Sequence, residues 1–300
     1  MSFNDNASLD TSQVTGGRGG RRGGGGVRVG GGIGGLLLVI VAAYFGIPLA
    51  GGDAGGSGLG PGTEPGVERT ADVGNCRTGA DANTDLECRV VGTINSVQAY
   101  WAVALPEFGT RYTPSKTVLY EGQAESACGT ASNAVGPFYC PADKLVYIDT
   151  SFFADLTNRF GADDGALAQE YVVAHEYGHH IQDILGLLDE AQKDPQGAQS
   201  GAVRVELMAD CLAGVWASNA ARTKDAQGQT YLKPLTEQDI ASALSAAAAV
   251  GDDRIQESTQ GQVNPESWTH GSAAARQQWF TTGYTKGTIN ACDTFAAGAV

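Results

Sequence analysis

The sequence predicts an α+β protein: one mostly helical domain with a small sheet, behind a single N-terminal transmembrane helix. Two stretches with apolar residues spaced three and four apart, about 164–185 and 201–221, predict long buried helices. An uncharged stretch at residues 33–50 predicts the membrane helix. Short runs rich in β-branched and aromatic residues predict the sheet: 117–120, 138–140 and 144–149.

Composition limits the classes of protein to which the chain can belong. Its 300 residues allow one sizeable domain with appendages, and many of the 43 glycines crowd the first 66 residues. The net charge of −14 argues against a nucleic-acid partner for the folded part. Six cysteines, none in a C-x-x-C pair, indicate up to three disulfides in an exported protein.

The first 75 residues are predicted to form three appendages. Residues 1–32 are polar and rich in glycine and arginine, which predicts a disordered tail. As a helix, residues 33–50 would span about 27 Å, the short end of a bilayer crossing. Residues 51–75 are rich in glycine, proline and serine and are expected to be a flexible tether. The folded domain is expected at residues 76–300.

The stretch at residues 33–50 has two other interpretations. A cleaved signal peptide fits less well, because the run is long and follows a tail of about thirty residues. A buried core helix fits poorly between glycine-rich flanks. The arginines of the tail precede the stretch, so a single-pass membrane protein would keep its N-terminus in the cytoplasm and place the domain outside.

Further elements are expected in the domain. Residues 93–108 have helical spacing with Asn95 or Ser96 as the N-cap. The runs at 138–140 and 144–149 form either a hairpin or two successive strands. Two more helices are expected from Thr236 through Val250 and from Ser272 to about Thr282.

The first long helix carries His175-Glu176-Tyr177-Gly178-His179. Residues four apart share a helix face, so His175 and His179 can bind one cation, and Glu176 can act as general base on a water at that cation. A buried helix with two incidental histidines is the alternative. A glycine at position 178 costs about 1 kcal/mol of helix propensity, which suggests that another backbone packs closely there.

A catalytic zinc needs a third protein ligand, and Glu206 in the second long helix is the candidate. Asp210 follows it by four residues on the same face. It is therefore placed to accept a hydrogen bond from a metal-binding histidine. A solvated acidic face is the alternative, although Leu207 and Cys211 make it a poor fit.

These residues resemble the bacterial putative neutral zinc metallopeptidase family. The resemblance extends over about residues 93–295 and is carried by the runs 136–143, 146–149, 175–182, 204–211, 270–272 and 292–295. It implies a zincin-like fold with one Zn²⁺ bound by His175, His179 and Glu206, and Glu176 as base. It also implies that substrate lies along an edge strand, for which 144–149 is the candidate. Met208 departs from the pattern, where we expect glutamine.

Two other histidines have open or structural roles. His270 precedes the last helix and is the candidate for stabilising the oxyanion of peptide hydrolysis. Alternatively, it is a surface residue in a helix-entry turn. His180 faces partly away from the metal and is expected to be structural.

The cysteines allow fifteen pairings, and proximity in the sequence suggests Cys76–Cys88 and Cys128–Cys140. This leaves Cys211–Cys292, which would attach the C-terminal tail to the helix of Glu206. A buried free thiol at Cys211 is the alternative.

Together these observations predict a membrane-anchored zinc endopeptidase whose domain lies outside the cytoplasm and acts on peptides or proteins, without nucleic acid. They leave the oligomeric state open. One alternative is a non-catalytic, zinc-stabilised scaffold or binding domain, against which an intact Glu176 argues. Another is a cytosolic enzyme, for which six cysteines are harder to explain.

Overall fold

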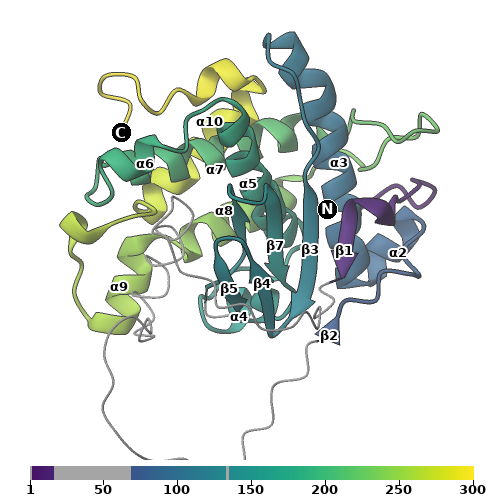
Figure 1. The fold of residues 1–300 in the computed structure, drawn as a ribbon, viewed down its shortest axis with the longest axis horizontal. Coiled ribbons are helices and arrows are strands. Elements are labelled where there is room, and N and C mark those ends of the chain that lie inside the picture. The colour runs from purple at the N-terminus through teal and green to yellow at the C-terminus, as the bar shows by residue number, and fades with distance from the viewer. Residues whose placement is uncertain (1, 17–68, 133–134) are drawn as a thin grey trace, which may run out of the picture.

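The computed structural model describes residues 2–16, 69–132 and 135–300 (Figure 1). The helices are α2 (Gly79–Thr84), α3 (Leu86–Glu107), α4 (Phe152–Asn158), α5 (Ala166–Ile184), α6 (Glu190–Lys193), α7 (Gly201–Ala220), α8 (Glu237–Ala249), α9 (Asp252–Gln260) and α10 (Ala273–Lys286). The strands are β1 (Val14–Gly16), β2 (Arg69–Thr70), β3 (Lys116–Glu121), β4 (Gln123–Ser126), β5 (Gly129–Ser132), β6 (Phe138–Cys140) and β7 (Leu145–Asp149). Short 3-10 turns lie at Thr11–Gln13, Pro265–Ser267 and Ile289–Cys292. The predicted α+β class is confirmed.

The main sheet has the strand order β1-β3-β7-β6. β1, β3 and β7 are parallel, and β6 is antiparallel to β7. β2 pairs with the end of β3, beyond the residues that pair with β1. The hairpin interpretation of β6 and β7 is therefore correct. The prediction that residues 144–149 form the edge strand is wrong, because β7 lies between β3 and β6, and β6 is the edge.

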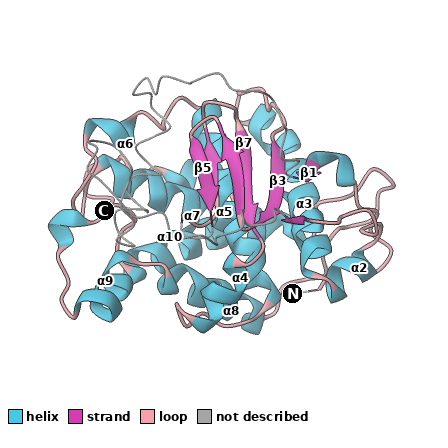
Figure 2. Cartoon of the chain, turned by 60° about the horizontal axis from the view of Figure 1, so that its bottom comes forward, coloured by secondary structure: helices cyan, strands magenta, loops and turns pink. Residues whose placement is uncertain are grey.

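α5 occupies the centre of the fold. It packs against β6 and β7 on one side and against α3, α7 and α8 on others. Figure 2 shows the strands standing in front of α5 and α7. Most residues of α5 are buried. A Cβ built at Gly178 would lie 3.0 Å from both the Cα and the carbonyl oxygen of Ala209, so a glycine here lets α5 approach the backbone of α7, as expected.

The starts of three helices can be compared with those predicted from the sequence. α8 and α10 begin where the sequence predicted, with Thr236 and Ser272 as their N-caps. α3 instead begins at Leu86, where the Asp85 side chain accepts a hydrogen bond from the Cys88 backbone. Asn95 and Ser96 therefore lie inside α3 and are not caps. α2, α4, α6, α9 and the β4–β5 hairpin were not predicted.

The N-terminal segment is part of the domain. The prediction of disorder across residues 1–32 is wrong for residues 2–16, because β1 pairs with β3 and several apolar side chains of the segment are buried. β2 also places the start of the downstream part of the domain earlier than residue 76. The sequence did not predict this packing, because the segment is mostly polar and its few apolar residues are widely spaced.

The predicted transmembrane helix at 33–50 lies outside the described residues, as do most of the predicted tail and tether. Among the helices that the structure does describe, none combines the length and apolar character needed to span a bilayer.

All six cysteines are paired. The bonds are Cys76–Cys88, Cys128–Cys140 and Cys211–Cys292, which confirms the pairing suggested by the sequence and removes the free-thiol alternative for Cys211.

Candidate metal centre

Two histidines of α5 and one glutamate of α7 bring three ligand atoms together. Nε2 of His175 lies 3.2 Å from Oε2 of Glu206, and Nε2 of His179 lies 3.5 Å from Oε1. One ligand atom from each residue lies within 4.8 Å of the others. Ligands of a tetrahedral zinc lie roughly 3.3 Å apart, given bond lengths of about 2.0–2.2 Å. The three side chains therefore fit one zinc ion and leave a fourth position for water or substrate.

Asp210 fixes the orientation of His175. Its Oδ1 lies 2.8 Å from Nδ1 of His175, which leaves Nε2 directed at Glu206. The same carboxylate accepts two hydrogen bonds from Arg276, Nε to Oδ2 at 2.8 Å and Nη2 to Oδ1 at 3.0 Å, and a third from the Tyr171 hydroxyl. Such an arrangement sets the tautomer and angle of a metal-binding imidazole before metal arrives.

The charge of Asp210 is maintained although the residue is completely buried. Burial alone would raise the pKa of this carboxyl, but Arg276 and His175 outweigh burial and lower the pKa. Burial likewise opposes the charged form of His175, yet Asp210 and Glu206 raise the pKa of this histidine to about 10. Negative charge thus surrounds the site where a cation would sit.

His179 has a neutral counterpart to Asp210. Its Nδ1 lies 2.8 Å from Oε1 of Gln182, whose own amide nitrogen donates to the carbonyl oxygen of Val205 at 2.6 Å. The amide is therefore held between α5 and α7 and directs Nε2 of His179 toward Glu206. The two ligand histidines are both oriented, one by an ion-paired carboxylate and one by an amide.

Glu176 lies on the same turn of α5 as both histidines and is 7% exposed. Burial raises the pKa of its carboxyl, while His175 and His179 act in the opposite direction. A buried carboxyl whose pKa is raised is better suited to accept and return a proton than one at its ordinary pKa.

His270 is held on a loop that Asp252 organises. One carboxylate oxygen of Asp252 accepts hydrogen bonds from the backbone N–H groups of Thr269, His270 and Gly271 at 2.7–2.9 Å. The other lies 3.5 Å from Nδ1 of His270. Burial opposes the charged ring, but Asp252 and Glu206 together raise the pKa of His270. Gly271 of this loop packs against Val203 and Leu207 of α7, the helix that carries Glu206.

His180 points elsewhere. Its Nδ1 lies 3.1 Å from the Tyr139 hydroxyl and its Nε2 lies 2.7 Å from the carbonyl oxygen of Thr113. Both ring nitrogens are engaged away from Glu206, which agrees with the structural role expected for this residue.

The C-terminal tail supports the helix that carries Glu206. Cys292 is bonded to Cys211, directly after Asp210. Thr294 donates from Oγ1 to the carbonyl oxygen of Arg204 at 2.7 Å and accepts a hydrogen bond from the Arg204 side chain. These bonds hold α7 on both sides of Glu206. Met208, the departure from the family pattern, is buried and does not belong to the ligand set.

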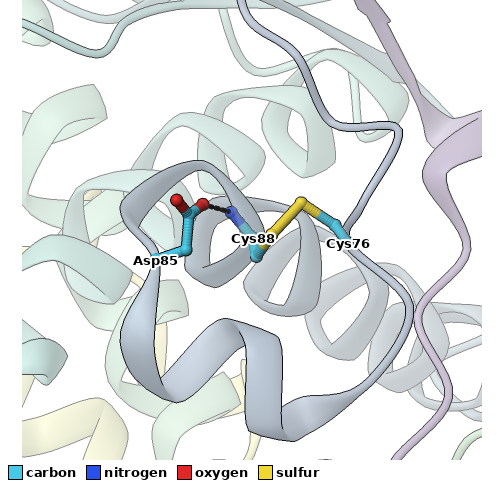
Figure 3. Close-up of side chains that lie close together, drawn as sticks. All are labelled: Cys76, Asp85 and Cys88. Carbon is cyan, nitrogen blue, oxygen red and sulfur yellow. Dashed lines mark hydrogen bonds between the residues drawn. A yellow bond between two sulfur atoms is a disulfide. The ribbon is translucent and has the colours of Figure 1, made fainter.

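A second group with metal-ligand chemistry has a different explanation. Cys76, Asp85 and Cys88 lie close together near the start of α3 (Figure 3). The two sulfurs form a disulfide, and Asp85 caps the helix by accepting from the Cys88 N–H at 2.9 Å. Neither sulfur is available as a thiolate, so the group is structural.

Four residues around the site were not identified from the sequence: Tyr171, Gln182, Asp252 and Arg276. Tyr171 precedes His175 by four residues and Gln182 follows His179 by three, so helical spacing placed both near the ligands. Asp252 and Arg276 come from distant elements, and no local pattern marks them.

Comparisons with known proteins agree with this geometry. A family model described as "Putative neutral zinc metallopeptidase" matches residues 4–295. "Uncharacterized protein Rv2575" of Mycobacterium tuberculosis is 57% identical over 227 residues, covering 75% of this chain and 76% of the relative. "Uncharacterized protein YpfJ" of Escherichia coli K12 is 37% identical over 265 residues, covering 87% and 85%. No solved structure was found to match the chain.

Proposed function

Because the chain belongs to the family of putative neutral zinc metallopeptidases, we propose that it is a zinc-dependent endopeptidase acting on peptides or proteins. The observation that carries this proposal is the convergence of His175, His179 and Glu206 beside Glu176. A purely structural zinc site is usually closed by four protein ligands, whereas three ligands and a nearby carboxylate suit catalysis.

Zinc bound to these residues would act as a Lewis acid that polarises the peptide carbonyl and makes water nucleophilic near neutral pH. Glu176 takes the proton of the attacking water and delivers it to the leaving amine. Asp210 and Gln182 keep the imidazoles of His175 and His179 in the orientation that binding requires.

His270 is the proposed donor to the oxyanion that develops during attack. Its raised pKa favours the protonated ring, which has a hydrogen to donate. Asp252 holds the backbone on both sides of the ring, so the donor is positioned before substrate binds.

The substrate is proposed to bind along β6. This strand ends the main sheet and packs beside α5, which carries the two histidines and Glu176. An extended peptide can add to such an edge through main-chain hydrogen bonds. This mode suits cleavage within a chain, because it does not require a free terminus.

The catalytic domain is proposed to lie outside the cytoplasm. Three disulfides support this location, since cytosolic thiols are kept reduced. Association with a membrane through residues 33–50 remains the prediction made from the sequence.

The test is cleavage of a diverse peptide mixture by the zinc-loaded full chain, compared with Glu176→Gln. Glu107→Gln, at an exposed position near the end of α3, is the matched control. We expect cleavage by wild type and control, and a loss of about 100-fold or more in Glu176→Gln without loss of zinc. The full chain is needed because residues 2–16 belong to the domain.

The alternative is a scaffold stabilised by zinc. It predicts that wild type, control and Glu176→Gln each bind one zinc and that none cleaves any peptide in the mixture. That result would overturn the enzyme proposal.

A further inference from the structure

Residues 2–16 pack into the domain. Phe3 and Ala7 are completely buried, and Leu9 and Val14 nearly so. β1 extends the main sheet by pairing in parallel with β3 (Figure 1). These residues are therefore a component of the hydrophobic core.

Side chains of the domain satisfy the backbone of this segment. Asn95, buried inside α3, accepts from the Asp10 N–H at 2.7 Å and donates to the Asp10 carbonyl oxygen at 3.0 Å. Asn83 does the same for Phe3, at 2.8 and 3.1 Å. Asp225, in the loop before α8, accepts from the Ser8 N–H at 2.8 Å. A side-chain amide that pairs with both the N–H and the carbonyl oxygen of one residue fits that backbone position specifically, and the amide of Asn95 is also buried.

Two glycines provide the space that the segment needs. A Cβ at Gly92 would lie 2.6 Å from the Phe3 ring, and a Cβ at Gly79 would lie 2.0 Å from the carbonyl oxygen of Asn4. Both distances are far below van der Waals contact. The domain thus carries polar receptors and glycine clearances for residues 2–16, as expected of a permanent part of its fold.

This packing has a consequence for membrane topology. A single crossing by residues 33–50 would put residues 2–16 on one side of the bilayer and residues 69–300 on the other. A segment cannot pair with β3 across a bilayer. A single crossing between the two parts and the packed segment are therefore mutually exclusive.

We infer that residues 2–16 and the domain that carries the metal ligands lie on the same side of any membrane with which the protein associates. If the inference holds, it replaces the prediction of a single crossing with a cytoplasmic N-terminus and a domain outside the cytoplasm. The inference depends on the packing of the segment and is independent of the proposed peptidase activity.

Cysteine labelling tests the inference in intact cells. All six native cysteines are in disulfides, so one introduced cysteine is the free thiol that reacts. The full chain is made with Asn6→Cys, at an exposed position of the segment, or Gln227→Cys, at an exposed position of the domain. Each is treated with a membrane-impermeant maleimide before and after permeabilisation. We expect the two variants to react to the same extent, within about two-fold, under each condition.

Labelling of Gln227→Cys in intact cells, with Asn6→Cys reacting only after permeabilisation, would overturn the inference, because it shows one crossing between the two sites. Labelling of both only after permeabilisation would support a common side and overturn the proposed extracytoplasmic location.

A crosslink provides the second measurement. Ser8 and Thr78 face each other in an antiparallel bridge, flanked by the hydrogen bonds Leu9 N–H to Arg77 and Gly79 N–H to Ala7. Ser8 and Thr78 therefore form a non-hydrogen-bonded pair, in which the Cα atoms lie about 4.5 Å apart. A disulfide can join Cα atoms at this distance. Ser8→Cys with Thr78→Cys should form an intrachain disulfide in cells. Ser8→Cys with Thr130→Cys, in β5, is the control and should not.

An intrachain bond in the first pair supports the inference. Failure of that pair to crosslink, with Asn6→Cys protected and Gln227→Cys labelled in intact cells, would overturn it. A covalent dimer from the first pair would also support a common side, and would show that the segment packs on a neighbouring copy of the chain.

Discussion

Two carboxylates, that of Asp210 in α7 and that of Glu170 in α5, are buried to nearly the same degree, and their surroundings differ completely. Asp210 is 0% exposed and accepts hydrogen bonds from Arg276 and Tyr171 as well as contacting His175. Glu170 is 1% exposed, and within the described residues neither of its carboxylate oxygens has a hydrogen-bond partner. Asp210 contacts a metal ligand. The charged residues that affect the pKa of Glu170 are instead Arg89, which lowers it, and Asp239, which raises it.

The consequence is opposite protonation. Partner charges lower the pKa of Asp210, whereas burial raises the pKa of Glu170 to about 8. Burial is nearly equal for the two carboxyl groups, so it does not decide their charge state. The hydrogen-bond donors and positive charges beside each carboxyl decide it. Donors are concentrated where a cation would have to be bound, and this concentration distinguishes a prepared site from ordinary core.

The largest expected effect comes from removing the principal partner of Asp210. Arg276→Leu leaves a buried carboxylate without its cation and should lower the free energy of unfolding by about 3–5 kcal/mol. Urea denaturation of the full chain measures the change. Arg254→Leu, at an exposed position of α9, is the control. A loss within about 1 kcal/mol of this control would show that Asp210 does not depend on Arg276.

The second effect concerns metal affinity. Asp210→Asn keeps the shape of the side chain but removes the charge that orients His175, so zinc affinity should fall by about 10–100-fold. Competition with a chelator measures it. Asp164→Asn, exposed before α5, should bind zinc as tightly as wild type. Equal affinities in all three proteins would remove Asp210 from the metal site.

The smallest effect concerns Glu170 and is measured as the pH dependence of the free energy of unfolding. Glu170 in the folded protein keeps its proton up to about pH 8, whereas in the unfolded chain it loses it near pH 4.5. The folded state thus binds the extra proton between these values, and stability falls as pH rises through this window. One proton corresponds to about 1.4 kcal/mol per pH unit, so roughly 1 kcal/mol should be lost between pH 7 and pH 8.

Glu170→Gln carries no titrating group and should lose less stability over this interval than wild type or Glu107→Gln. Parallel pH profiles for wild type and Glu170→Gln would mean that Glu170 is ionised and paired in the folded protein.

The same contrast explains how much the sequence could predict. One helical turn separates His175 from His179 in α5, and one turn separates Glu206 from Asp210 in α7. Local spacing therefore identified both pairs. The partner of Asp210 lies 66 residues away in α10, and its neighbours have no distinctive pattern. Ligands on one helix can be predicted from spacing, whereas the residues that orient them depend on tertiary packing.

The two main errors have the same origin. Residues 2–16 have few apolar side chains, and Asn83 of α2 and Asn95 of α3 satisfy part of their backbone. Without these distant partners the segment has the composition of a disordered tail. The edge strand was assigned to β7 from the family resemblance and from its position in the sequence. Which strand ends a sheet is decided by pairing, and pairing with β3 placed β7 inside.

The most direct test of the metal centre is X-ray absorption spectroscopy at the zinc edge of the loaded full chain, beside Glu206→Gln. The account predicts one zinc per chain, with two imidazole nitrogens and oxygen ligands at about 2.0–2.2 Å and no sulfur. It also predicts that Glu206→Gln changes this coordination or loses the metal. A sulfur ligand at about 2.3 Å, or an unchanged spectrum for Glu206→Gln, would contradict the assignment of His175, His179 and Glu206 as the zinc site.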